Sequence, residues 1–351
     1  MDLANVDSAL HIFNLDNGLD QYHSLKSLTS DLKVKKSDSY VSSSSLSVIH
    51  HRARLIGKER LAVYTPAPHP GCGWGDEFYG ISLVDAFQQV GLDAELVYRK
   101  DWKNAAGQFS DIVHLRGIVK ISPVSTARNY MWLISHPDDV GEDELSACDS
   151  VFVASEPFSK RLTIEQNRVI DFLPQCSSFH PLDPRENIYA DDLRPFAVFV
   201  GDSKKVLRYP IDELVKKWSR LFLFGPNWNG VERLGSRYFP GVLANQLLPQ
   251  IYSSFGAVLN QHWGDMARSG FVSNRLYDIA ACGGRFITDW CDGIPADLAK
   301  FGDVWMGDDF DELFERQSPI SLIDRYEQSL AFYSDNSFLS RARTIIEKIY
   351  S

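Results

Sequence analysis

Residues 256–289 read GAVLNQHWGDMARSGFVSNRLYDIAACGGRFITD and contain a compact series of structural signals. The apolar run at 256–260 predicts a buried strand, which a polar loop with two glycines follows. Residues 272–282 predict a helix that ends at a glycine pair, and 285–288 predict the next strand. A strand, a helix and a second strand in this order are typical of a parallel α/β sheet.

The same alternation extends from this stretch in both directions along the chain. Upstream, in the first half of the chain, strands are predicted at 60–65, 94–98, 111–115, 131–135 and 150–154, with a helix at 77–90. In the second half, strands are predicted at 196–200 and 221–224, and helices at 211–220, 244–254, 309–316, 320–333 and 336–350. Residues 173–195 hold four prolines and little periodicity, which is typical of an interdomain linker.

These patterns predict the α/β class, with two doubly wound domains joined by the linker. Their boundaries are expected at about 59–185 and 190–335. Ligands of such sheets bind at the carboxyl ends of the strands, so two such ends are expected to face each other across a cleft.

The N-terminal residues 1–58 differ from the rest of the chain. Residues 37–47 read SDSYVSSSSLS, a polar low-complexity stretch, and spaced leucines before it suggest one or two short amphipathic helices. We interpret 1–58 as an extension made of a small helical element and a linker. A role in docking a partner is the alternative.

Composition narrows the classes of function and the compartment. The net charge of −10 argues against a nucleic-acid partner, although a few local cations suffice for a small anionic ligand. The five scattered cysteines lack metal-ligand spacing and are interpreted as reduced thiols. With no apolar leader or transmembrane run, a cytoplasmic location is expected, and peripheral membrane association stays open.

The start of the predicted helix at 272–282 carries residues suited to a nucleotide. Ser273 or Asn274 could cap the helix, whose N-terminus attracts phosphate. Arg275 adds a positive charge in the first turn. Asp278 lies three residues further on the same face, where a carboxylate could accept hydrogen bonds from a ribose. A surface ion pair between Arg275 and Asp278 is the alternative interpretation.

The sequence SNRLYDIAACGGRFITD (273–289) resembles the donor-site signature of the glycosyl transferases group 1 superfamily. The similarity is greatest to the branch of spore-maturation-type glycosyltransferases, and weaker likenesses lie at 132–155, 199–210 and 247–260. The resemblance implies the GT-B fold, in which two Rossmann-like domains face each other and the last helix, here 336–351, packs back on the first domain. It also implies metal-independent transfer of a sugar from a nucleotide diphosphate sugar to a glycan or glycoconjugate hydroxyl, with retention of configuration.

Two positions depart from the family pattern. Asp278 stands where the family usually has a glutamate that binds the nucleotide ribose, and the shorter side chain favours contact through water. Many relatives carry another glutamate eight positions earlier, where this chain has Gly270, so no role tied to that glutamate is expected.

A basic loop and a tryptophan complete the predicted donor site. Gly201, Lys204, Lys205 and Arg208 follow a predicted strand, and the resemblance implies that a basic residue in this region meets the diphosphate. Cations there would stabilise the charge on the leaving group. A solvated basic loop is the alternative. Trp263 could stack on a base or a sugar.

Three residues are candidates for catalysis. Asp76 lies in a glycine-rich loop at the start of the first predicted helix and could act as a general base on the acceptor hydroxyl, or only as a helix N-cap. His136 and His262 each follow a predicted strand, so both are expected to reach the cleft. A structural role is the alternative for each histidine.

No metal site and no cofactor are predicted beyond the nucleotide diphosphate sugar itself as a substrate. Residues 308–312 read DDFDE, but acids are favourable at the start of a helix without a metal. The alternative functions are an epimerase- or phosphorylase-like enzyme of the same fold, or a nucleotide-sugar-binding protein that has lost activity.

Overall fold

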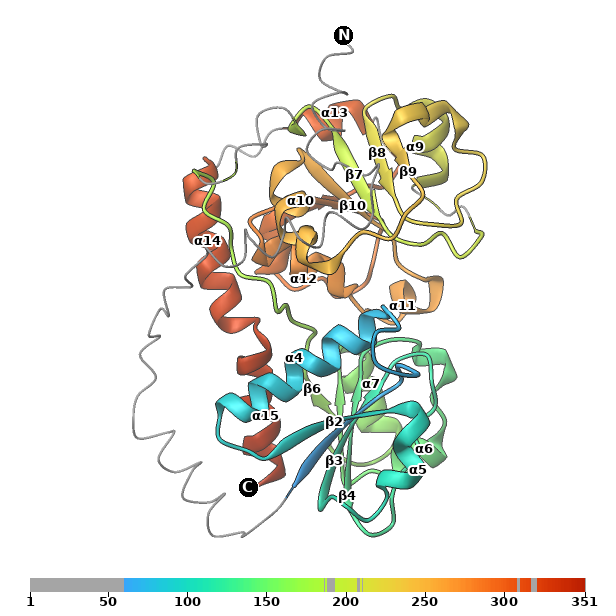
Figure 1. Ribbon diagram of the computed structural model, residues 1–351, viewed down its shortest axis with the longest axis vertical. Helices are drawn as coiled ribbons and strands as arrows, with labels where there is room; N and C mark the ends of the chain where they lie inside the picture. The colour runs from blue at the N-terminus through green and yellow to red at the C-terminus, as the bar shows by residue number, and fades with distance from the viewer. Residues whose placement is uncertain are drawn as a thin grey trace.

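The computed structural model describes residues 60–185, 187, 193–206, 209, 211–307, 310–316 and 321–350. Within them the chain forms two separate sheets, each with six parallel strands and helices packed against it (Figure 1). The predicted α/β class with two Rossmann-like domains is therefore confirmed. The predicted extension at 1–58 lies outside the described residues.

The N-terminal sheet winds outward from its first and third strands. Its order is β2-β1-β3-β4-β5-β6, so the chain moves one way from β1 to β2 and the other way from β3 onward. The strands are β1 (Leu61–Thr65), β2 (Ala94–Tyr98), β3 (Asp111–Arg116), β4 (Arg128–Leu133), β5 (Ser150–Val153) and β6 (Asp171–Phe172). The helices are α4 (Gly75–Gln89), α5 (Trp102–Ala105), α6 (Glu142–Ser146) and α7 (Glu156–Glu165).

The C-terminal sheet has the order β12-β11-β10-β7-β8-β9, with its switch point between β7 and β10. The strands are β7 (Ala197–Val200), β8 (Leu221–Phe224), β9 (Tyr238–Phe239), β10 (Ala257–Asn260), β11 (Phe286–Thr288) and β12 (Gly302–Val304). The helices are α9 (Ile211–Lys217), α10 (Leu248–Ser254), α11 (Gly264–Arg268), α12 (Asn274–Ala281) and α13 (Phe310–Glu315). Short 3-10 helices lie at Arg99–Asp101, Pro137–Asp139, Glu232–Arg237, Asn245–Leu247 and Leu298–Phe301.

Apolar runs form these sheets because helices cover both faces of a parallel sheet, so most side chains of a central strand are buried. All four residues of β8 are buried. Phe224 stacks on Phe239 of β9 with ring centroids 4.6 Å apart. Burial of such rings supplies most of the favourable free energy of folding.

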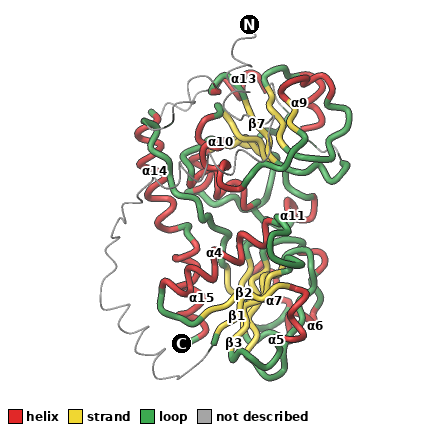
Figure 2. The backbone as a smooth tube through the Cα atoms, viewed as in Figure 1, coloured by secondary structure: helices red, strands yellow, loops and turns green. Residues whose placement is uncertain are grey.

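The end of the chain returns from the second domain to the first. Helix α14 (Leu322–Asp335) lies beside the C-terminal domain, and α15 (Phe338–Ile349) runs down beside α4 (Figures 1 and 2). Phe338, Ile345 and Ile349 belong to the same buried cluster as the N-terminal strands. Arg341 fastens the crossing, because its guanidinium donates to the carbonyl oxygens of Pro174 and Gln175 at 2.8 and 3.0 Å.

None of the helices in the described part of the chain is long and apolar enough to span a bilayer.

Candidate functional site

A cavity of about 360 Å³ lies between the two domains, where the switch points of both sheets meet. The lining segments follow β1, β4, β7 and β10 and begin α12, so they stand at carboxyl ends of strands. Nine predicted site residues line it: Asp76, His136, Gly201, Lys204, His262, Trp263, Ser273, Asn274 and Arg275. Lys205 and Asp278 do not line it, and Arg208 is outside the described residues.

Arg275 is held over the end of β7. Its Nη1 donates to Asn260 Oδ1 at 3.2 Å, and its guanidinium carbon lies 4.8 Å from the centre of the Phe199 ring. A β-carbon at Gly201 would come within 3.0 Å of Nη2, so glycine lets the guanidinium lie against the backbone. Asp278 is buried and its carboxylate bonds to Ser177 and Asn274, so the alternative of a surface ion pair between Arg275 and Asp278 is not supported. The charge of Arg275 faces the cavity instead.

His262 has a positioning role that the sequence did not reveal. Its side chain is fully buried, and Nδ1 lies 2.6 Å from Asp289 Oδ1. Nε2 accepts the backbone N–H of Ser273 at 3.1 Å, which makes Nδ1 the protonated donor to Asp289. The expectation of a catalytic His262 is therefore corrected, because both ring nitrogens are hydrogen-bonded within the protein. Ser273 does occupy the N-cap position of α12, but its side chain makes no capping bond.

Asp289 anchors this network at the end of β11. Its carboxylate also accepts the backbone N–H of His262, at 3.0 and 2.9 Å, and the Thr288 hydroxyl at 3.1 Å. Thr288 Oγ1 in turn accepts from the amide of Asn260, which is the partner of Arg275. One chain of hydrogen bonds thus fixes both the start of α12 and the guanidinium that faces the cavity.

We expect Asp289→Asn to destabilise the protein by about 1–3 kcal/mol, because an amide nitrogen would face donors that now meet a carboxylate. The loss should appear as a lower free energy of unfolding in urea, together with weaker nucleotide binding. Asp292→Asn, an exposed change three residues away, is the matched control. Equal stabilities of the two variants would contradict the positioning role.

Among the described residues of the basic loop after β7, Lys204 is the cation that lines the cavity. Its ammonium lies 3.3 Å from Asp202 Oδ2. Burial by itself raises the pKa of Asp202, but hydrogen bonds from Asn227 and Lys204 and the Lys204 charge hold it below its ordinary value. Lys205 is exposed and stands outside the cavity wall, which corrects its assignment as a direct donor contact.

Asp278 lies behind the cavity wall. Its carboxylate accepts the Ser177 hydroxyl at 2.7 Å and the Asn274 amide at 3.0 Å. Ser177 belongs to the segment that joins the two domains, so this hydrogen bond links α12 to that segment. Burial raises the pKa of Asp278 to about 7, partly offset by Ser177, Arg275 and Asn274. Because Asp278 does not line the cavity, direct contact with a donor bound there is not supported, and a contact with ribose through water stays a prediction.

The buried Asp278 makes stability depend on pH. The folded-state pKa of about 7 exceeds the unfolded value of 3.8, so stability from this group is full below about pH 4. It is lost as pH rises toward 7, since the folded protein must then bury a charge. We expect Asp278→Asn to gain stability over the wild type at pH 8 relative to pH 5. Thermal unfolding at both values checks this, and parallel pH profiles for the two proteins would count against it.

Gly270 stands where the resembling family often has a glutamate, and this position has no room for a side chain. Gly270 has φ +70°, and a β-carbon would lie 2.6 Å from the Asp292 carbonyl oxygen and 2.7 Å from Pro157 Cγ. Beside it, the Ser155 hydroxyl of the first domain donates to the Ser269 carbonyl oxygen at 2.5 Å. Gly270 therefore serves the close approach of the two domains.

Asp76 faces the cavity from the first domain. It lies inside the first turn of α4, after an N-cap at Trp74 that makes no side-chain bond, so the N-cap alternative is excluded. Its carboxylate lies against Gly117, where a β-carbon would be 3.2 Å from Oδ1. Among the described residues it has no hydrogen-bond partner, and burial raises the pKa of Asp76 to about 6. A carboxylate with these properties can accept a proton near neutral pH.

The glycine-rich loop before α4 is folded around a different carboxylate. Glu77 accepts the backbone N–H groups of Gly71 and Gly73, at 2.5 and 3.0 Å, and the Tyr98 hydroxyl at 3.3 Å. Burial acts to raise the pKa of Glu77, but these bonds lower it below its ordinary value. Glu77 thus shapes the loop that presents Asp76.

The remaining predicted residues at the cavity are His136 and Trp263. His136 has a left-handed backbone, with φ 55°, and its Nδ1 lies 2.9 Å from the Ser135 hydroxyl oxygen. Trp263 is 39% exposed, so much of its ring is accessible for stacking. Asn260 and Asp289 were not predicted as site residues. Asn260 ends a predicted strand and Asp289 directly follows one, so both could have been found among the residues at the carboxyl ends of strands.

In the described part of the chain, no group of three or more His, Cys, Asp or Glu side chains is arranged to hold a metal ion.

Solved structures resemble this chain across both domains. An α-glucosyltransferase in complex with UDP-glucose and abasic-site DNA superposes with a TM-score of 0.56 at 14% identity, covering 83% of this chain and 99% of that one. The fold is GT-B. AviGT4, a glycosyltransferase of avilamycin A biosynthesis, gives 0.50 at 14% identity over 83% and 97% of the two chains. A structure described as trehalose-6-phosphate from E. coli, bound with UDP-2-fluoro glucose, gives 0.50 at 12% identity over 84% and 99%.

No family model matches the sequence, and no curated protein matches it significantly. The resemblance to the spore-maturation-type branch therefore stays a prediction, whereas the GT-B fold implied by the same residues is confirmed.

Proposed function

We propose that the protein is a glycosyltransferase that moves a sugar from a nucleotide diphosphate sugar to a hydroxyl acceptor. The observation that carries this proposal is the cavity between facing switch points, with Arg275 on one wall and Asp76 on the other. In the proposed reaction the cation stabilises the leaving diphosphate and the carboxylate accepts the proton of the acceptor hydroxyl.

The donor lies with its diphosphate at Arg275 and at the N-terminus of α12, whose free N–H groups and dipole favour negative charge. Lys204 adds positive charge, and Trp263 stacks on the base or the sugar. The acceptor oxygen bonds to the anomeric carbon and Asp76 accepts its proton, while the bond from that carbon to the diphosphate breaks and the nucleoside diphosphate leaves with the electron pair. Neighbours of the same fold hold UDP-glucose or a fluorinated analogue, which supports a nucleotide sugar as the donor class.

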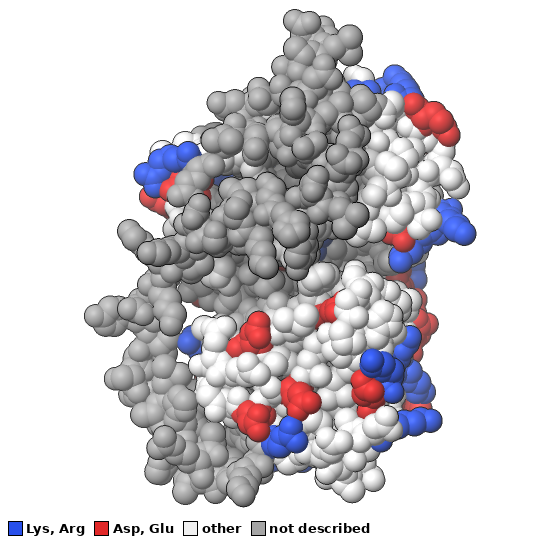
Figure 3. Space-filling model, in the orientation of Figure 1, with Lys and Arg blue, Asp and Glu red and all other residues white. Residues whose placement is uncertain are grey.

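The acceptor is proposed to be a glycan or glycoconjugate. Two solved α-glucosyltransferase structures of this fold hold DNA, one with an abasic site and one a 13-mer containing a HMU base. This chain has a net charge of −10, and in Figure 3 acidic and basic side chains are interspersed over the lower domain. A nucleic-acid surface would instead carry clustered lysine and arginine.

The test combines nucleotide binding with turnover. UDP, GDP, dTDP and CMP are compared by thermal shift, since a ligand at 100 times its Kd adds about 2.7 kcal/mol of stability. Donors carrying the selected base are then incubated with oligosaccharides and with duplex DNA, and products are identified by mass spectrometry. NMR of the anomeric proton reports retention. Nucleotide binding without any transfer or hydrolysis would favour the inactive binding protein, and transfer to DNA alone would overturn the proposed acceptor.

The proposed reaction is metal-independent, with cationic side chains in place of a divalent ion. We therefore expect turnover to survive EDTA, because Arg275 and Lys204 supply the charge near the diphosphate. Initial rates with and without chelator check this. A rate that falls on chelation and returns with Mg²⁺ or Mn²⁺ would refute it.

A further inference from the structure

A second cavity, of about 470 Å³, lies at the opposite edge of the C-terminal sheet. Its walls come from residues just before the strands begin: Arg194 before β7, Arg220 before β8, Gly256 before β10 and Arg285 before β11. The cavity lined by Arg275 and Asp76, called the donor cavity from here on, lies at the other ends of these strands. Asn260 lies four residues along the chain from Gly256, so at about 3.3 Å per residue the two ends of this strand are about 13 Å apart.

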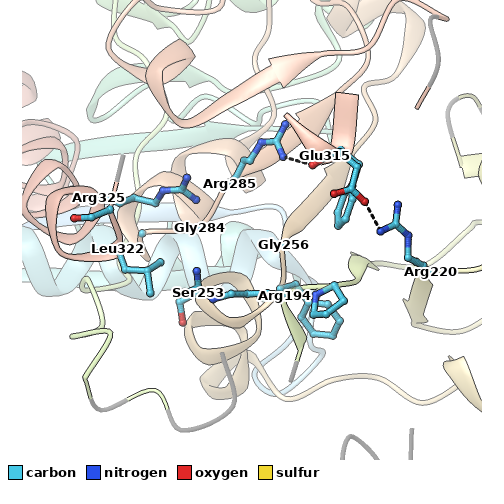
Figure 4. A pocket seen from close by; sticks show the side chains of 14 residues that line it. Arg194, Arg220, Ser253, Gly256, Gly284, Arg285, Glu315, Leu322 and Arg325 are labelled. Carbon is cyan, nitrogen blue, oxygen red and sulfur yellow. Dashed lines mark hydrogen bonds and ion pairs between the residues drawn. The ribbon is translucent and has the colours of Figure 1, made fainter. Parts of the chain in front are cut away.

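Four arginines line this second cavity, although the protein is acidic overall (Figure 4). They are Arg194, Arg220, Arg285 and Arg325, and of the described residues that line the cavity Glu315 is the one carboxylate. Because they come from four distant parts of the sequence, folding brings these like charges together. Gathering them in a recess costs free energy unless anions neutralise them.

Arg220 and Arg285 are held by carboxylates of the domain. Arg220 donates to Asp311 at 2.8 Å and to Glu315 at 2.6 Å. Arg285 is 5% exposed and donates to Asp303 at 2.7 Å and to two backbone carbonyls of α13. These bonds fix both guanidinium groups in place, so their positions do not depend on a ligand.

Arg325 is different. It extends from the first turn of α14 toward Arg285 (Figure 4), and no hydrogen bond or ion pair of its guanidinium is present among the described residues. Burial, followed by the charges of Arg285 and Arg194, lowers the pKa of Arg325. This cation is therefore repelled by its neighbours and faces an open cavity.

The surroundings also favour an anion. Helix α14 begins at the cavity wall, where Ser321 caps it by accepting the Asp324 N–H at 3.1 Å. The positive end of this 14-residue helix thus adds to the charge of the arginines. Gly256 and Gly284 lie between the arginines in Figure 4, so the floor there is backbone rather than bulky side chain.

We propose that this second cavity binds a small phosphate-bearing anion, with Arg325 as its principal contact and the fixed charge of Arg285 beside it. Planar guanidinium groups donate paired hydrogen bonds to phosphate oxygens, and a cavity of this size holds a ligand larger than a single phosphate group. The site is separate from the donor cavity and does not depend on the proposed transferase activity.

The experiment uses the full chain with inorganic phosphate and pyrophosphate as probes, measured by calorimetry and by thermal unfolding. Because pyrophosphate can also enter the donor cavity, Arg275→Ala serves to remove that contribution. Arg325→Gln tests the proposed site, and Arg161→Gln, which removes an exposed charge on α7, is the matched control. Binding to phosphate alone or to pyrophosphate alone distinguishes a mono- from a diphosphate ligand.

In the Arg275→Ala background we expect pyrophosphate to bind, and Arg325→Gln to weaken that binding at least about tenfold, while Arg161→Gln has no effect. Without anion, Arg325→Gln should unfold at the same or a higher temperature than the parent, because a repelled charge is gone. The proposal is overturned if neither probe binds in the Arg275→Ala background, if Arg325→Gln binds as the parent does, or if it unfolds earlier without anion.

Discussion

Arg275→Ala is expected to lower kcat/KM for the sugar donor by about 100- to 1,000-fold, the effect of losing one preorganised group that stabilises developing charge. The guanidinium is held in place before substrate binds, by Asn260 Oδ1 at 3.2 Å and by the Phe199 ring. Donor binding therefore loses no free energy to ordering of the Arg275 side chain, and the positive charge is already in position to stabilise the leaving diphosphate.

The loss should be divided between binding and turnover. A charge-assisted hydrogen bond to a ground-state diphosphate contributes about 1.5–3 kcal/mol, which calorimetry with the nucleotide diphosphate measures directly. Negative charge on the leaving group grows toward the transition state, so kcat should fall as well.

Two controls separate this effect from a general loss of structure. Arg268→Ala removes an exposed arginine of α11 that pairs with Asp138 across the domains, and should leave kcat near the wild-type value. Arg275→Lys keeps the charge but loses the paired donors, so an intermediate rate is expected. A wild-type rate in Arg275→Ala would remove this residue from the donor site.

The sequence predicted the main strands of both sheets because central parallel strands read as continuous apolar runs. The run at 221–224 became β8 with the same boundaries, and 196–200 became β7, shorter by one residue. The edge strands β6, β9 and β12 were missed, since two or three residues are too few to show a period. Their pairing is determined by neighbouring strands rather than by local sequence.

The location of the cavity was also predictable. In open α/β sheets, ligands bind outside the carboxyl ends of the strands at the switch point, so residues that follow predicted strands are expected there. Gly201, His262 and Arg275 all reach that edge. What each side chain does there was not predictable. His262 is hydrogen-bonded to the carboxylate of Asp289, which lies 27 residues later in the chain, and no local sequence pattern predicts that partner.

Helical spacing explains the different fates of Arg275 and Asp278. Three residues at 3.6 per turn leave the two side chains about 60° apart around the helix axis, close enough to share a stripe. That angle is also wide enough to turn Asp278 toward Ser177 while Arg275 faces the cavity. The spacing in the sequence predicted that Arg275 and Asp278 lie on the same side of the helix. Asp278 is the one that is buried because Ser177, in the segment between the domains, donates a hydrogen bond to it.

Asp76→Asn is expected to lower kcat by about 100- to 10,000-fold, the usual contribution of a positioned general base. An amide of the same shape preserves packing against Gly117 but cannot take a proton. Nucleotide affinity should stay near the wild-type value, because Asp76 stands on the wall opposite Arg275. Asp85→Asn, an exposed change on the same helix α4, is the matched control.

The pH profile distinguishes a base from a residue that only shapes the cavity. Burial holds the pKa of Asp76 at about 6, so wild-type kcat/KM should fall as pH drops below 6, when the carboxylate is protonated, and should level off above that value. The residual activity of Asp76→Asn should lack this dependence. If the variant kept the acid limb with a midpoint near 6, another group would have to be the base, and Asp76 would be left as a residue that orients the acceptor.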